Sequence, residues 1–210
     1  MAEFEEIEFK KSNSPEKSKD YVKELNSVLY EHLSYPLRKD MIENVEQVYV
    51  GTQPPGYRRG AYKDDTIYIP SWAAYRMQVE EIASINFHEM GHALLNHRFP
   101  DVDAQKSADF LMLHATGLNY YKRDIGQYSR HREELEELLV PYKDLKEEIR
   151  QIMQDKRRNW YPELSRGFKD MLEDDDIELE NIGKFMPAEV YASLKNGEIL
   201  TPEDFPLSED

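Results

Sequence analysis

Two histidines four residues apart enclose a glutamate in the segment His88-Glu89-Met90-Gly91-His92 of this 210-residue chain. The segment lies within residues 74–97, where the spacing of apolar side chains predicts one long helix. Four residues turn a helix by about 400°, so the two imidazoles would lie one turn apart and only about 40° apart around the axis. We therefore expect a fold built around this helix, with both rings directed at one site.

Apolar residues occupy nearly the whole circumference of the predicted helix, which indicates that it is buried. Two imidazoles and a carboxylate need partners there, because unpaired polar groups are costly to remove from water. The sequence lacks cysteine, so a metal ion would take histidine nitrogens and carboxylate oxygens. We expect His88 and His92 to bind Zn²⁺ and Glu89 to act as general base toward a bound water. The alternative is a pair of histidines hydrogen-bonded within the core.

A third metal ligand is expected on a second predicted helix, over residues 102–116. Asp103 is the preferred candidate, because the preceding Phe99-Pro100 lets the chain turn back and small alanines on the second helix permit a close approach. Asp101 and His97 are the alternatives, although His97 stays on the first helix. Asp101 and Asp103 are also residues that favour helix N-termini, Asp101 as a cap and Asp103 as an acid in the first turn.

Hydrolysis at such a site needs a donor that stabilises the developing oxyanion. The candidates are His114, Tyr120 and Tyr121, at or just past the end of the second helix. We select His114 and Tyr120 as catalytic residues beside Glu89, while each tyrosine could equally lie at the edge of the core. A short strand over residues 60–62 could bind a peptide substrate along its open edge.

The segment HEMGHALLNH, residues 88–97, resembles the active-site helix of the ImmA/IrrE-type metallopeptidases. Residues 101–105 and 110–113 resemble the second helix of that family. The resemblance implies a zincin-like zinc peptidase fold with a small sheet beside the active-site helix. It implies that Asp103 takes the place of the family's glutamate ligand. It also implies a bacterial or phage-encoded hydrolase that cuts a regulatory protein such as a transcriptional repressor. Residues 117–210 lie outside the resemblance.

The rest of the pattern predicts an α+β fold that is mainly helical. Strands are expected at residues 45–51, 60–62 and 66–69, and we expect them to form a small antiparallel sheet. Residues 1–13 are predicted to be a flexible tail and 14–128 the zincin-like domain. Residues 129–210 are predicted to be a helical C-terminal extension of unknown role.

Acidic residues number 42 against 27 Lys and Arg, which gives a formal net charge of −15. A chain this acidic repels phosphate backbones and anionic lipids, so neither nucleic acid nor a membrane is expected as a partner. No apolar run is long enough to span a bilayer, and the acidic N-terminus does not resemble a signal peptide. We therefore expect a cytoplasmic protein that acts on a protein or peptide substrate.

Two other functions are compatible with the sequence. Apolar residues at heptad spacing over residues 135–152 could pack on their own domain, mediate self-association or dock a partner. The chain would then be a non-catalytic binding module for a basic or regulatory partner, with or without zinc. A DNA-repair protease has a similar motif helix, but it usually needs a basic surface, which the net charge argues against.

Overall fold

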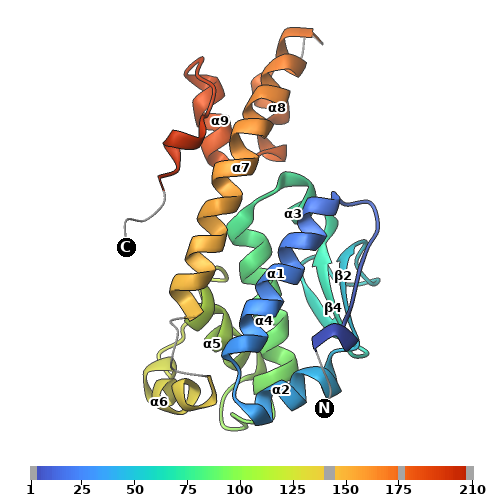
Figure 1. Ribbon diagram of the computed structural model, residues 1–210, viewed down its shortest axis with the longest axis vertical. Helices are drawn as coiled ribbons and strands as arrows, with labels where there is room; N and C mark the ends of the chain where they lie inside the picture. The colour runs from blue at the N-terminus through green and yellow to red at the C-terminus, as the bar shows by residue number, and fades with distance from the viewer. Residues whose placement is uncertain (1–3, 140–144, 175–177, 207–210) are drawn as a thin grey trace.

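The computed structural model describes residues 4–139, 145–174 and 178–206 and is mainly helical, with one small sheet (Figure 1). None of the helices in these ranges is both long and apolar enough to cross a membrane. The helices are α1 (Glu16–His32), α2 (Tyr35–Asn44), α3 (Ser71–Arg76), α4 (Val79–Leu95), α5 (Ala104–Thr116), α6 (Tyr128–Leu138), α7 (Leu145–Asp174), α8 (Leu179–Ile182) and α9 (Ala188–Lys195). Short 3-10 turns are η1 (Phe4–Glu6), η2 (Gly183–Phe185) and η3 (Pro202–Asp204).

The sheet is mixed, so the prediction of an antiparallel sheet was wrong. Its four strands are β1 (Glu8–Lys11), β2 (Gln47–Gly51), β3 (Ala61–Lys63) and β4 (Thr66–Pro70), in the order β1-β2-β4-β3. β1 and β4 both lie parallel to β2, and only β3 and β4 are antiparallel. Helices α1 and α2 lie between β1 and β2 in the chain, and a crossover of this length allows parallel pairing.

The N-terminal segment, predicted to be a flexible tail over residues 1–13, instead supplies strand β1 and the buried side chain of Ile7. β1 has the sequence EFKK and is one of the two edge strands of the sheet. Charged residues are common on edge strands because they discourage pairing with other chains. The charged residues of β1, which suit an edge strand, are therefore the ones that suggested a flexible tail.

The long helix predicted over residues 74–97 is interrupted at Met77 and Gln78, so α4 begins later than predicted. Helix α3 ends at Arg76, and Met77 adopts a left-handed conformation with φ of 48° before α4 begins at Val79.

The hairpin between β3 and β4 turns through Asp64 and Asp65, whose φ values of 49° and 55° fit a two-residue type I′ turn.

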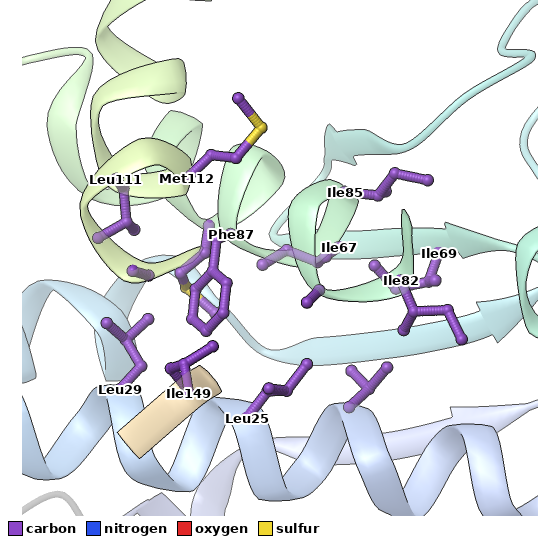
Figure 2. Packing of buried hydrophobic residues seen from close by; sticks show 14 of the residues in the cluster. Leu25, Leu29, Ile67, Ile69, Ile82, Ile85, Phe87, Leu111, Met112 and Ile149 are labelled. Atoms are coloured by element: carbon purple, nitrogen blue, oxygen red, sulfur yellow. The ribbon is translucent and has the colours of Figure 1, made fainter. Parts of the chain in front are cut away.

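Helix α4 runs through the middle of the fold, between the sheet and α5 (Figure 1). It contacts α1, α2, α5 and α7 as well as β3 and β4. Figure 2 shows Phe87 of α4 among aliphatic side chains from the sheet and from three other helices. These side chains include Leu25 and Leu29 of α1, Ile67 and Ile69 of β4, Leu111 and Met112 of α5, and Ile149 of α7.

The C-terminal segment, residues 129–210, shares this core over part of its length. Leu135 of α6 and Leu145 and Ile149 of α7 are buried in the same apolar cluster as α4. Within the described residues, the apolar side chains of the heptad pattern over residues 135–152 therefore pack on their own chain. Pro141 and Tyr142 lie outside the described residues. The far end of α7 extends beyond the sheet and α4 and carries α8 and α9 (Figure 1).

Candidate metal centre

Three potential metal ligands lie together on α4. One nitrogen of His88, one of His92 and a carboxylate oxygen of Glu89 all lie within 4.8 Å of one another. His88 and Glu89 are buried, with 2% and 4% of their surfaces exposed. The two imidazole rings are 4.7 Å apart between centroids. Among the residues that the structure describes, these three side chains form the group of histidines and carboxylates that could hold a metal ion.

Asp109 of α5 fixes the orientation of His88. Its carboxylate is fully buried and lies 2.7 Å from His88 Nδ1. A carboxylate accepts hydrogen bonds, so His88 Nδ1 carries the ring proton and donates a hydrogen bond to Asp109. The lone pair of the imidazole is then on Nε2. Arg123 neutralises the same carboxylate with two hydrogen bonds of 3.0 and 2.9 Å. Metal-binding histidines are commonly held by such a carboxylate behind the ring.

His92 is neutral and has polar neighbours at both ring nitrogens. Burial lowers its pKa to about 4, and the neighbouring His88 acts in the same direction. Nδ1 lies 3.0 Å from the Asn96 side-chain amide, and Nε2 lies 3.2 Å from that of Gln105. A neutral imidazole is the form that binds metal ions, so His92 is suited to the role without losing a proton.

Glu89 lies in a pocket beside strand β3, at one edge of the sheet. Burial raises its pKa to about 8, although the Tyr62 backbone N–H and the charge of Arg123 act in the opposite direction. Gly60 packs directly on it, because a Cβ atom at position 60 would lie 2.6 Å from Glu89 Oε1 and 2.5 Å from Ile85 Cγ2. A side chain at position 60 would therefore displace the carboxylate.

These residues line a cavity of about 380 Å³ between α4, β3 and the segments before β3 and after α5. The ring of Tyr121 lies 4.5 Å from that of His88 between centroids and forms part of the wall. Burial raises the pKa of Tyr121, with Glu89 contributing in the same direction. The lining residues are Tyr57, Arg59, Gly60, Ala61, Tyr62, His88, Glu89, His92, Asn96, Gln105, Tyr121 and Arg123.

Asp103, predicted as the third ligand, does not join this group. It is exposed and caps α5, where Oδ1 accepts a hydrogen bond of 3.0 Å from the Gln105 backbone N–H. The first turn of a helix has unpaired N–H groups, and a short carboxylate side chain at the N-cap satisfies one of them. The side chain that α5 brings to His92 is Gln105.

The two alternative ligands also have partners away from the cavity. His97 Nε2 lies 3.5 Å from a carboxylate oxygen of Asp40, and Asp101 lies 3.4 Å from His131 Nε2.

His114 and Tyr120, predicted as catalytic donors, lie outside the cavity lining. His114 Nδ1 is 3.3 Å from the Tyr128 hydroxyl. His114 follows Asp109 by five residues, which places it about 140° around α5 from the face that meets α4. The Tyr120 hydroxyl donates to Glu81 at 2.5 Å. Of the three candidate donors, Tyr121 is the one that the structure places at the site.

The residues of the site that were not predicted from the sequence include Asn96, Gln105, Asp109, Arg123 and Arg59. Gln105 and Asp109 are four residues apart, the same spacing as His88 and His92, so each pair shares one face of its helix. That spacing was available in the sequence as a signal. Arg123 and Arg59 lie outside helices and strands, where no periodicity identifies them.

Comparison with protein-family models, with curated proteins and with solved structures gives no match for this chain.

Proposed function

We propose that this protein is a zinc-dependent peptidase, with His88 and His92 as metal ligands and Glu89 as general base. The observation that carries the proposal is the convergence of two imidazoles and a carboxylate within 4.8 Å of one another at the wall of a cavity. Zn²⁺ accepts imidazole nitrogens as ligands and keeps a position for water at catalytic sites, and a carboxylate beside that position can act as the base. The cluster fits a metal ion further because Asp109 leaves a lone pair of His88 available and His92 is neutral.

The residues around the donors can supply the remaining chemistry. A bound zinc ion would supply Lewis-acid activation of a water molecule and of the scissile carbonyl group. Glu89 would accept the proton of that water and deliver it to the leaving amine, and burial, which raises its pKa to about 8, makes it a stronger base than an ordinary carboxylate. Tyr121 keeps its hydroxyl proton because its pKa is raised, so it can donate a hydrogen bond to developing negative charge.

A peptide is the substrate class that suits the neighbouring strand. β3 lies at the edge of the sheet, and Ala61 and Tyr62 of this strand line the cavity. An extended peptide can add to such an edge through backbone hydrogen bonds, which would bring its own carbonyl groups to the cavity. The resemblance of residues 88–113 to ImmA/IrrE-type metallopeptidases supports the same activity and suggests a regulatory protein as the natural substrate.

Replacing Glu89 with Gln tests the proposal, because the amide keeps the shape of the side chain and cannot act as the base. We expect the zinc-loaded wild type to produce new N-termini in a library of proteome-derived peptides, detected by mass spectrometry. The Glu89→Gln variant should bind zinc and lose at least a hundredfold of this cleavage, within the range typical of a general base. Glu81→Gln on the same helix, away from the cavity, is the control. Equal cleavage by wild type and Glu89→Gln would disprove the role of Glu89.

A further inference from the structure

The cavity has a cationic side that the proposed chemistry does not use. Arg59 and Arg123 both line it, and Glu89 is the one carboxylate among its lining residues. The chain as a whole carries a net charge of −15, so two arginines at one cavity contrast with the surface around them. Arginine in such a place binds planar anions, above all carboxylates, through its paired N–H groups.

The two guanidinium groups are placed by one aromatic ring. The guanidinium carbon of Arg123 lies 4.5 Å from the centroid of Tyr121, and that of Arg59 lies 5.4 Å from it. Tyr121 in turn contacts the ring of His88. Both arginines are therefore held near the proposed reaction centre by cation–π contacts, which do not use the N–H groups of the guanidinium.

The two arginines differ in what they already bind. Arg123 is engaged by the buried carboxylate of Asp109 and by Gln105. Arg59 is exposed at the rim, and no carboxylate of the described residues forms an ion pair with it. Its neighbour Arg58 is exposed as well but does not line the cavity. Arg59 is thus the cation that a bound substrate could neutralise.

We propose that Arg59, supported by Tyr121 and Arg123, forms a subsite that selects peptides carrying a carboxylate near the bond to be cleaved. The inference rests on the proposed peptidase function, because it assigns a substrate preference to the same cavity. The carboxylate comes from a Glu or Asp side chain or from a free C-terminus. A hydrogen bond to a charged group is worth enough to change affinity by about tenfold or more.

The test measures binding and therefore does not require cleavage. The probes are hexapeptides with an N-terminal zwitterionic rhodamine label, in which one Glu or one Gln is moved through each position of an Ala-Tyr background. Each is made with an amidated and with a free C-terminus, which separates the two sources of carboxylate. Fluorescence polarisation with Glu89→Gln, which cannot turn the probes over, should show about tenfold tighter binding of Glu than Gln at one position, or of free acid over amide. The preference should shrink with added salt.

The Arg59→Gln exchange, made in the Glu89→Gln background, should remove this preference, and Arg59→Lys should restore part of it through its charge. Arg58→Gln is the matched control and should keep the full preference, because it removes the same charge one residue away. Equal binding of Glu and Gln probes, including no detectable binding of either at millimolar concentration, would overturn the subsite. So would a preference that survives Arg59→Gln.

Cleavage of the same probes by the wild type separates the two proposals. If the wild type cleaves none of them while the carboxylate preference depends on Arg59, the peptidase function fails and the anion subsite stands. If the wild type cleaves Glu and Gln probes equally well and binds them equally, the subsite fails and the peptidase function stands.

Discussion

Helices α4 and α5 face each other across the candidate metal centre and contribute to it in different ways. α4 carries both imidazoles and the Glu89 carboxylate within five consecutive residues, and their spacing alone brings them together. α5 contributes Asp109 and Gln105, which contact the histidines from behind and from the side. The difference teaches that a local motif brings the candidate ligands together, whereas the groups that orient them depend on how a second helix docks.

Removal of a donor on α4 should have the largest effect. His92→Ala takes away one of two imidazoles, and we expect zinc affinity to fall by more than a hundredfold, beyond the range typical of second-layer residues. Isothermal titration calorimetry against zinc would measure it. His97→Ala is the matched control, because His97 lies near the end of α4 and pairs with Asp40 instead. Comparable losses in both variants would show that the donors are not confined to the motif.

Exchange of the carboxylate behind His88 should have an intermediate effect. In Asp109→Asn the amide can still accept from His88 Nδ1 but without the charge, and we expect zinc affinity to fall by about tenfold to a hundredfold. Arg123 would lose its charge partner, so circular dichroism must first show that the variant is folded. Asp103→Asn is the control, since Asn also caps helices and should leave zinc affinity unchanged. The reverse order of the two variants would restore Asp103 as a ligand.

A substitution at the contact between α4 and α5 should have a smaller effect, seen as a loss of free energy of unfolding. A Cβ atom on Gly91 of α4 would lie 2.6 Å from the carbonyl oxygen of Ala108 on α5. Gly91→Ala should therefore cost about 1–3 kcal/mol through overpacking. Gly167→Ala is the control, because Gly167 lies in α7 with open space around it, and alanine there should stabilise by up to about 1 kcal/mol. Urea denaturation measures both, and a neutral Gly91→Ala would show that the helices can separate without cost.

The sequence predicted the part of the site that depends on local geometry. His88, Glu89 and His92 share one helix, so their proximity follows from helical spacing. Of the two alanines expected at the approach of the second helix, Ala108 lies against Gly91 of α4, whereas Ala104 is exposed. The second helix was predicted over residues 102–116, and α5 does end at Thr116, because Gly117 adopts a left-handed conformation with φ of 72°.

What the sequence did not predict depends on competition between two uses of the same residue. Asp103 could bind a metal or cap α5, and the unpaired N–H groups of the helix start favour the cap. Lys10 and its charged neighbours could belong to a tail or an edge strand, and the parallel pairing of β1 with β2 decides between them. Such choices depend on long-range contacts, which local patterns do not contain.

The proposed metal centre depends on Asp109, not Asp103, as the acidic residue of α5 that supports it. The most direct test is the zinc content of three chains that are purified side by side without chelator or histidine tag. Mass spectrometry of the wild type, Asp103→Asn and Asp109→Asn after dialysis against limiting zinc gives the comparison. We predict about one zinc per chain in the wild type and in Asp103→Asn, and clearly less in Asp109→Asn. Zinc lost in Asp103→Asn and retained in Asp109→Asn, or absent from all three, would contradict this account.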